Sequence, residues 1–166
     1  PFWSWRHLTY FFAQDCFFLW CRNPMRVLAG TLLTNVLLRG MGCRIGKRTL
    51  FTDPLQAFDW NAVSVGDDCI IDGLLQLHSF EEMSLRVKRA EIGDGSAVNF
   101  GAMVMGGTVI EAGTTLLPLS VVLKAMQLRP AIYEGNPAEP LGPALTGPSL
   151  ASISGADRLA RATAAT

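Results

Sequence analysis

An aliphatic residue recurs at every sixth position in the middle of the chain, and this spacing restricts the possible folds more than any other feature. The repeat occupies Ile92, Val98, Val104, Ile110, Leu116 and Val122. A period of six fits neither the 3.6-residue period of a helix nor the two-residue period of a plain strand. It is the repeat of a hexapeptide β-helix, in which three hexapeptides form one triangular coil of about eighteen residues.

The fifth residue of each complete hexapeptide is small, which predicts where the chain turns. These residues are Ser96, Ala102, Thr108, Thr114 and Ser120. We expect the aliphatic residue to point into the prism and the small residue to fit the corner. Neighbouring coils would pair as parallel strands about 4.8 Å apart. Such prisms wind left-handed, against the usual crossover preference. The pattern predicts a mainly β fold, a left-handed parallel β-helix of about five coils.

Weaker copies of the repeat extend upstream and define the domain boundaries. Ile45 leads to Phe51, and Val65 leads through Ile71 to Leu77. The spacing from Leu77 to Ile92 is not a multiple of six, so residues 79–90 are predicted to form a loop inserted at one corner. We therefore expect an apolar helical arm over 1–42, the β-helix domain over 43–141 and a flexible tail over 142–166.

The predicted arm is rich in aromatic residues, with nine of the fifteen in the chain lying in its first twenty residues. Helices are predicted over 8–21 and 27–38, with a break around Arg22, Asn23 and Pro24. Neither apolar run reaches the roughly twenty residues that a membrane-spanning helix needs. Two interpretations remain open: the arm lies in the membrane interface, or it caps the first coil or packs on a neighbouring domain.

Composition and motifs exclude several classes of function. The formal net charge is zero and 17% of residues are charged, which argues against a nucleic-acid-binding protein. The four cysteines lack a CxxC pair, so we expect small buried thiols in a reducing compartment. The repeat carries one histidine, too few for a three-histidine metal centre, and no metal is predicted. Because the chain begins at Pro1 without methionine, we expect it to be a piece of a longer protein.

Specific segments resemble known proteins. The segment Tyr133-Glu134-Gly135-Asn136-Pro137-Ala138 is similar to the one that closes many enzymes of the hexapeptide-repeat acyltransferase superfamily. Further segments resemble the C-terminal region of ε-poly-lysine-synthetase-type nonribosomal peptide synthetases. These are residues 42–48, 63–68 and 75–82, together with the arm over 1–38.

The resemblance implies an acyl- or aminoacyl-transferase that uses a phosphopantetheine thioester donor, as the C-terminal part of a synthetase making an amino-acid homopolymer. It also implies a groove shared with sister β-helix domains or with a homotrimer, a small acceptor such as an amino acid, and a location on the cytoplasmic side of the membrane. Glu139 follows Pro137-Ala138 at a position that is often basic in the superfamily. Its charge would repel phosphate, which disfavours CoA and fits either a carrier-bound donor or no donor at all.

His78 is the candidate catalytic base, because acyl transfer to an amine needs a group that titrates near neutral pH. It follows the inward Leu77 at the place where the inserted loop leaves the prism. The alternative is a packing histidine that anchors the loop. Glu81 or Glu82 could accept a hydrogen bond from the imidazole and fix its tautomer, as in a catalytic triad. The alternative for both is an ordinary solvated carboxylate.

Four residues are candidates for binding the donor. Asn99 follows the inward Val98 and could line the groove, or could simply form a turn. Arg86, Lys88 and Arg89 lie on the inserted loop and could meet the phosphate of a pantetheine arm, or form a solvated basic loop. The whole domain also has a non-catalytic interpretation, as a β-helix scaffold or docking domain in a larger membrane-associated protein.

Overall fold

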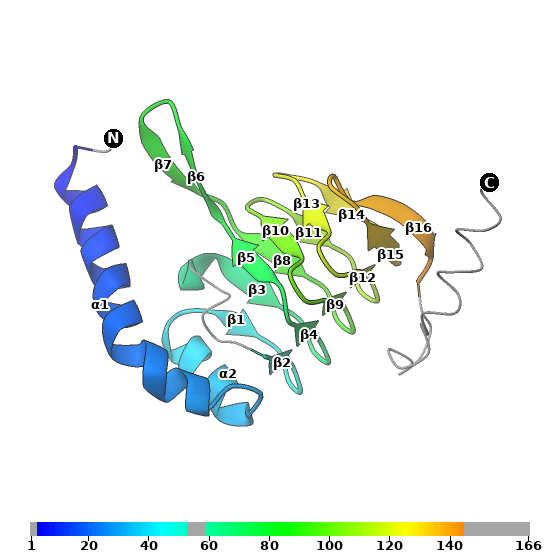
Figure 1. The fold of residues 1–166 in the computed structure, drawn as a ribbon, viewed down its shortest axis with the longest axis horizontal. Coiled ribbons are helices and arrows are strands. Elements are labelled where there is room, and N and C mark those ends of the chain that lie inside the picture. Colours follow the sequence, from blue (N-terminus) through cyan, green and yellow to red (C-terminus); the bar gives the residue numbers. More distant parts are fainter. Residues whose placement is uncertain (1–2, 53–58, 145–166) are drawn as a thin grey trace.

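A computed structural model of the chain describes residues 3–52 and 59–144. Two helices, α1 (Trp5–Val27) and α2 (Leu32–Gly40), precede a succession of short strands that coil around one axis (Figure 1). A short 3-10 turn, η2 (Trp60–Ala62), lies between the first and second coils. The strands form three sheets that are the faces of a triangular prism.

Each face collects one strand from successive coils. The five-stranded face has the order β1 (Arg44–Ile45), β3 (Val63–Val65), β8 (Ala90–Ile92), β11 (Val109–Ile110) and β14 (Gln127–Leu128). The six-stranded face has the order β2 (Leu50–Phe51), β4 (Ile70–Ile71), β9 (Ala97–Val98), β12 (Thr115–Leu116), β15 (Ala131–Glu134) and β16 (Glu139–Pro143). The three-stranded face contains β5 (Leu74–Gln76), β10 (Met103–Met105) and β13 (Val121–Val122). Strands within each face pair in parallel, except β15 with β16. The chain is a left-handed parallel β-helix, as predicted.

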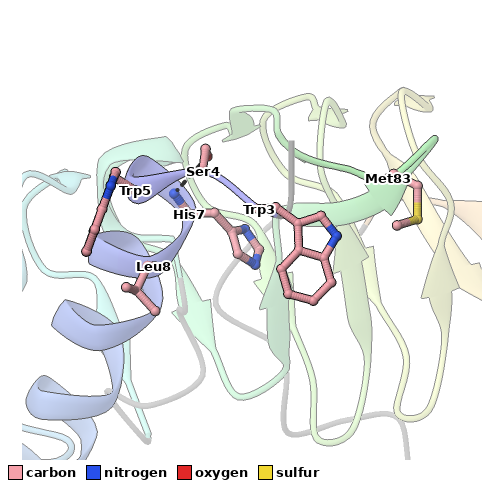
Figure 2. Close-up of a pocket in the computed structure, with 6 residues that line it drawn as sticks. All are labelled: Trp3, Ser4, Trp5, His7, Leu8 and Met83. Carbon is pink, nitrogen blue, oxygen red and sulfur yellow. Dashed lines mark hydrogen bonds between the residues drawn. The ribbon is translucent and has the colours of Figure 1, made fainter.

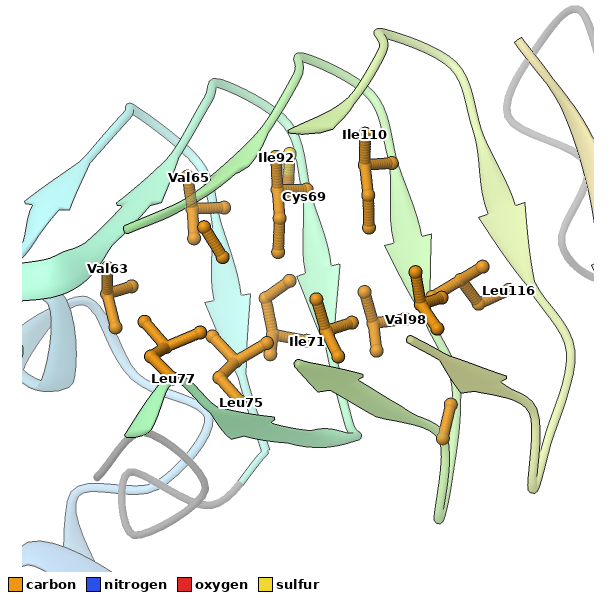
Figure 3. Close-up of a cluster of buried hydrophobic side chains, with 14 of the residues drawn as sticks. Val63, Val65, Cys69, Ile71, Leu75, Leu77, Ile92, Val98, Ile110 and Leu116 are labelled. Carbon is orange, nitrogen blue, oxygen red and sulfur yellow. The ribbon is translucent and has the colours of Figure 1, made fainter. Parts of the chain in front are cut away.

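The six-residue register builds the core. Ile92, Val98, Ile110 and Leu116 point into the prism (Figure 3), and each exposes 4% or less of its surface. Val104 is fully buried as well. Equivalent residues stack in line across coils: Val98 pairs with Ile71 on one side and with Leu116 on the other. A continuous aliphatic column therefore fills the interior, and its burial is the main driving force for the fold.

Small residues occupy the corners because the turn leaves no room for larger ones. Thr108, Thr114 and Ser120 are completely buried there. The Thr114 hydroxyl donates to the carbonyl of Glu111 in its own coil and lies near that of Arg129 in the next. The corner residue Cys69 is also fully buried, and so is most of Cys43, as expected for small buried thiols.

One corner departs from the register. Leu75, not Leu77, pairs with Val104, and only four positions separate Leu75 from Ile71 instead of six. Gly73 makes this shortcut possible, because a Cβ at Gly73 would lie 2.4 Å from the carbonyl oxygen of Ala102. Leu77 is buried as well. The predicted step from Ile71 to Leu77 is therefore wrong by two residues, because glycine permits a tighter turn than the standard hexapeptide.

The predicted insertion is a two-stranded antiparallel hairpin that stands away from the prism (Figure 1). Its strands are β6 (His78–Glu81) and β7 (Ser84–Val87). Lys124, which follows β13, donates to Glu81 at 2.7 Å and links the hairpin to the coil of β13, two coils further along the three-stranded face.

The arm differs from the prediction in one respect. α1 is continuous from Trp5 to Val27, so the break predicted around Arg22 and Pro24 is wrong. Pro24 lies in the last turn, where the loss of one donor removes a single intrahelical hydrogen bond. The chain turns instead at Gly30, whose φ of +73° favours glycine. None of the helices in the described residues is long and apolar enough to cross a membrane.

α2 closes the open end of the prism. Leu38 is fully buried, and the Asn35 side chain donates to the carbonyl of Thr49 at 2.6 Å. The Arg39 guanidinium donates to the carbonyls of Ile45 and Gly46. These contacts satisfy strand edges that the first coil would otherwise expose. At the opposite end the antiparallel β15–β16 pair closes the prism, and most of the predicted flexible tail, residues 145–166, lies outside the described residues.

Candidate active site

His78 lies where the three-stranded face ends and the hairpin begins, as the first residue of β6. Its side chain is 16% exposed, and its Nδ1 atom lies 2.9 Å from Oδ2 of Asp59. The Phe80 ring meets the imidazole edge to face, with the ring centroids 5.7 Å apart. The imidazole is therefore held by a carboxylate at one nitrogen and by an aromatic ring at its side.

Asp59 is a buried acid, with 1% of its surface exposed. It precedes the turn η2 at the position where an aspartate usually caps, yet its carboxylate makes no capping hydrogen bond. The two carboxylate oxygens bind side chains instead: Oδ2 meets His78, and Oδ1 accepts a hydrogen bond from the Tyr10 hydroxyl of α1. A buried carboxylate is costly unless it is hydrogen-bonded in this way.

The arrangement fixes the chemistry of the imidazole. With Asp59 accepting at Nδ1, the proton of neutral His78 resides on Nδ1 and the basic lone pair on Nε2. A carboxylate in this position also stabilises the imidazolium that forms when Nε2 takes up a proton. The Asp59–His78 pair can therefore work as a general base.

Tyr10 supplies a hydrogen atom that stays in place at physiological pH. Burial raises the pKa of the Tyr10 phenol far above its ordinary value near 10, and the hydrogen bond and negative charge of Asp59 raise it further. The phenol consequently remains a donor to Asp59 at any pH at which an enzyme works.

A narrow crevice runs beside the imidazole. It is lined by Leu77, His78, Ser79, Glu81, Lys88, Gly106 and Lys124. The wall at Gly106 is bare backbone, because a Cβ there would lie 2.3 Å from the carbonyl oxygen of Leu77. Lys88, Lys124, Glu81 and His78 thus line a space that is bounded in part by main chain.

Glu81 and Glu82 have contacts other than the one predicted. Glu81 accepts hydrogen bonds from Lys124 and Ser79, and the Lys124 bond is the largest influence lowering the pKa of its carboxyl. Glu82 pairs with Arg86 across the hairpin at 3.0 Å. At Nδ1 of His78, Asp59 occupies the place that the sequence analysis assigned to one of these glutamates.

The four predicted donor-binding residues are divided by the fold. Lys88 lines the crevice, Arg86 pairs with the hairpin glutamates, and Arg89 lies 3.5 Å from the carbonyl of Asn61. Asn99 lies at another corner, between the six-stranded and three-stranded faces, and its amide donates to the Leu116 carbonyl at 2.6 Å. Of these residues, the structure places Lys88 in the crevice beside His78.

Sequence reasoning missed Asp59 and Tyr10. Counting six residues back from Val65 reaches Asp59, where the repeat predicts an inward aliphatic residue. An acid at a position where the repeat expects an inward aliphatic residue was the available signal. Tyr10 gave none, because it lies in a run of aromatic residues and 49 positions from Asp59.

A second hollow lies between the start of α1 and the tip of the hairpin (Figure 2). It has a volume of about 600 Å³ and is lined by Trp3, Ser4, Trp5, His7, Leu8 and Met83. This space is mostly apolar and open. Within residues 3–52 and 59–144, no three histidine, cysteine or acidic side chains lie close enough together to hold a metal ion.

Comparison with known proteins gives one relative in sequence and several in structure. The chain is 26% identical over 121 residues to the delta-poly-L-ornithine synthetase of Acinetobacter baumannii (strain AB307-0294). The match covers 71% of this chain but 9% of the synthetase, so the chain spans less than a tenth of that protein. No protein-family model matches the chain.

Two solved structures share the fold. One is a hexapeptide-repeat-containing acetyltransferase from Vibrio cholerae O1 biovar eltor, solved with acetyl coenzyme A. Its TM-score is 0.57 at 19% identity, and the match covers 64% of this chain and 63% of that one. The other is a maltose O-acetyltransferase from Clostridium difficile 630, with a TM-score of 0.50, 14% identity and coverage of 81% and 89%. The predicted resemblances to hexapeptide-repeat acyltransferases and to an amino-acid-polymer synthetase are both confirmed.

Proposed function

We propose that this chain is an acyl- or aminoacyl-transferase module in which His78 is the general base and Asp59 orients it. The observation that carries the proposal is the buried Asp59 carboxylate, which lies 2.9 Å from Nδ1 of His78 beside a crevice. A histidine that merely anchored the hairpin would not require a buried acid behind it. The acyltransferase fold of the structural relatives supports the same reading.

The transfer step would join an amine to a thioester carbonyl. As the amine nitrogen attacks the carbonyl carbon, His78 Nε2 takes its proton and Asp59 stabilises the resulting imidazolium. The carbon–sulfur bond then breaks, and the thiolate leaves with the proton that the imidazolium returns. The products are an amide and a free thiol, and His78 ends in its starting state.

The donor is a phosphopantetheine thioester held on a carrier domain, with CoA the less favoured form. The acetyl coenzyme A complex of the Vibrio cholerae relative supports a thioester of this class. Lys88, in the crevice, is suited to the phosphate of the arm. The exposed Glu139 disfavours the extra phosphates of CoA.

The sequence relative supports a proposal for the acceptor and for the larger protein to which the module belongs. Similarity to a poly-L-ornithine synthetase over 71% of this chain supports a place in a nonribosomal peptide synthetase that makes an amino-acid homopolymer. The acceptor would then be an amino acid, joined through a free amino group. A sister β-helix domain, or two further copies of this chain, would complete the groove beside the crevice.

The proposed location of the module is the cytoplasmic side of the membrane, which it would contact through the arm. Trp5, Leu8, Phe12 and Leu19 are all more than half exposed. Spacings of three, four and seven residues place them on one side of α1, away from Tyr10, which faces Asp59. Such an apolar stripe with tryptophan at its end suits the membrane interface.

The decisive experiment replaces the base and its partner in the full-length synthetase. We expect His78→Ala to lower the rate of polymer formation by about 10²- to 10⁴-fold, the usual contribution of a general base. Asp59→Asn should give a loss of at least about tenfold, because an amide no longer stabilises the imidazolium. Adenylation and carrier loading, measured on the same proteins, are the internal controls and should be unchanged.

Glu91→Gln is a matched control for Asp59→Asn, because Glu91 is an exposed acid on the five-stranded face. Its polymer formation should equal that of the wild type. If His78→Ala folds normally and forms polymer at the wild-type rate, the module is not catalytic through this histidine. The non-catalytic scaffold or docking function would then be the correct one.

A further inference from the structure

The N-terminal helix reaches the candidate active site through the second oxygen of Asp59. The Asp59 side chain is fully buried, and its two oxygens meet Tyr10 and His78. The two contacts compete for no common atom, so one carboxylate bridges the arm and the imidazole. Each partner therefore fixes one oxygen of the carboxylate.

A second contact connects α1 to the same place. The rings of Phe11 and Phe80 stack with centroids 6.2 Å apart and planes 16° from parallel. Phe80 in turn packs edge-on against His78. Adjacent residues of one helix therefore touch both neighbours of the imidazole, the acid through Tyr10 and the ring through Phe11.

The first turns of α1 leave the hairpin otherwise loosely covered. The apolar hollow of Figure 2 separates Trp3 and Leu8 of the arm from Met83 at the hairpin tip. Around His78, Tyr10 and Phe11 provide contacts from the arm to Asp59 and Phe80.

We propose that Tyr10 is a positioning residue for the transfer reaction, and that α1 is therefore part of the active site. By donating to Asp59, Tyr10 holds the carboxylate in the orientation that keeps the proton of His78 on Nδ1 and the lone pair on Nε2. This inference rests on the proposed function, because it needs His78 to be the base. It follows that any movement of α1 away from the prism changes the base itself.

Tyr10→Phe is the direct test, because it removes one hydroxyl and keeps the ring. In the full-length synthetase we expect kcat to fall about three- to tenfold with KM for the acceptor unchanged, since Tyr10 touches no substrate. Tyr133→Phe is the matched control: it removes the phenol that accepts from the Arg129 amide near the far end of the prism. It should leave both kcat and KM as in the wild type.

A spectroscopic measurement of the His78 tautomer tests the positioning role of Tyr10 without an activity assay. In this chain, nitrogen NMR of the imidazole reports which nitrogen carries the proton, and the chain has two histidines to assign. Wild-type and Tyr133→Phe chains should show His78 protonated at Nδ1 at alkaline pH. Tyr10→Phe should show a mixture of the two tautomers.

The outcomes separate the two ideas. If Tyr10→Phe matches the wild type in tautomer and in kcat while His78→Ala is inactive, the positioning role is wrong and the proposed function stands. If Tyr10→Phe and Tyr133→Phe lose activity equally with His78 unchanged, Tyr10 is only structural and the inference is also overturned. If His78→Ala is fully active, the proposed function fails first, and the inference fails with it.

Discussion

Asp59 and His78 come from successive coils of the prism, and the stacking of coils brings them together. Neither residue is unusual alone: an aspartate before a turn normally caps it, and a histidine on a hairpin normally packs. Their separation of 2.9 Å, with the acid buried, is what gives the pair a chemical use. A buried acid needs partners, and here both partners are side chains that can move or hold a proton.

The contact between Tyr10 and Asp59 leads us to expect that Tyr10 ionises only at strongly alkaline pH. Burial, the hydrogen bond to Asp59 and its charge all raise the pKa of Tyr10. The near-ultraviolet absorbance of tyrosinate is titrated in the wild type and in Tyr10→Phe, and the difference between the two curves reports Tyr10. That difference should appear only well above pH 10. Asp59→Asn should move that titration down, because it removes a negative charge that opposes ionisation.

The raised pKa of Tyr10 also makes the stability of the fold depend on pH. Because the folded pKa of Tyr10 lies above its unfolded value near 10, its contribution is complete below pH 10 and is lost as pH rises towards the folded value. Ionisation of Tyr10 near pH 10 with the fold intact would contradict the contact.

Among the elements, the strands were predictable where the repeat is strict and not where a glycine alters it. From Ile92 to Val122 each strand lies where the six-residue period placed it. Gly73 shortens the corner between β4 and β5 by two residues, because a backbone without a side chain turns more tightly than the standard hexapeptide. The six-residue pattern alone does not reveal a corner that is two residues shorter.

The candidate site was predictable only in part, for a related reason. His78 was identified because imidazole is rare in the chain and lies where the insertion begins. Its partner was sought nearby in sequence, at Glu81 and Glu82. Contacts between coils join residues about one coil apart, and contacts with α1 join residues still further apart, so short-range patterns did not reveal Asp59 or Tyr10.

The tight corner can be tested by adding one methyl group. Gly73→Ala should lower the free energy of unfolding by about 1–3 kcal/mol, because the new Cβ overlaps the carbonyl oxygen of Ala102. Gly40→Ala is the matched control, since a Cβ there meets nothing within 4 Å. Denaturant unfolding measures both. Equal stability of the two variants would show that the corner is not tight.

On the scale of the whole molecule, the prism has two differently finished ends. One end closes with the antiparallel β15–β16 pair, and the other is covered by α2 with α1 beside it (Figure 1). The outer side of α2 is apolar: Leu32, Leu33 and Val36 are more than half exposed, whereas Thr34 and Asn35 face the prism. This reversal of the usual pattern gives α2 an exposed apolar side, as α1 has in its stripe, and such apolar sides suit an interface.

The proposed membrane contact can be measured with vesicles. Wild-type chain should co-sediment with vesicles of phosphatidylethanolamine and phosphatidylglycerol, and replacing Leu8 and Phe12 by serine should reduce the bound fraction several-fold. Replacing Leu123 and Leu141 by serine, at exposed positions of the prism, is the matched control and should leave binding unchanged. Equal binding by wild type and the arm variant would favour a protein neighbour for this surface.

We propose that the prism carries out aminolysis of a thioester with His78 as the base, and a single-turnover experiment measures that step by itself. Full-length synthetase is loaded with a radiolabelled aminoacyl thioester and mixed with the acceptor amino acid, and thioester and amide are counted over time. We expect rapid conversion in the wild type and a retained thioester in His78→Ala, with equal loading of the two proteins. Amide formation at the wild-type rate in His78→Ala would contradict it.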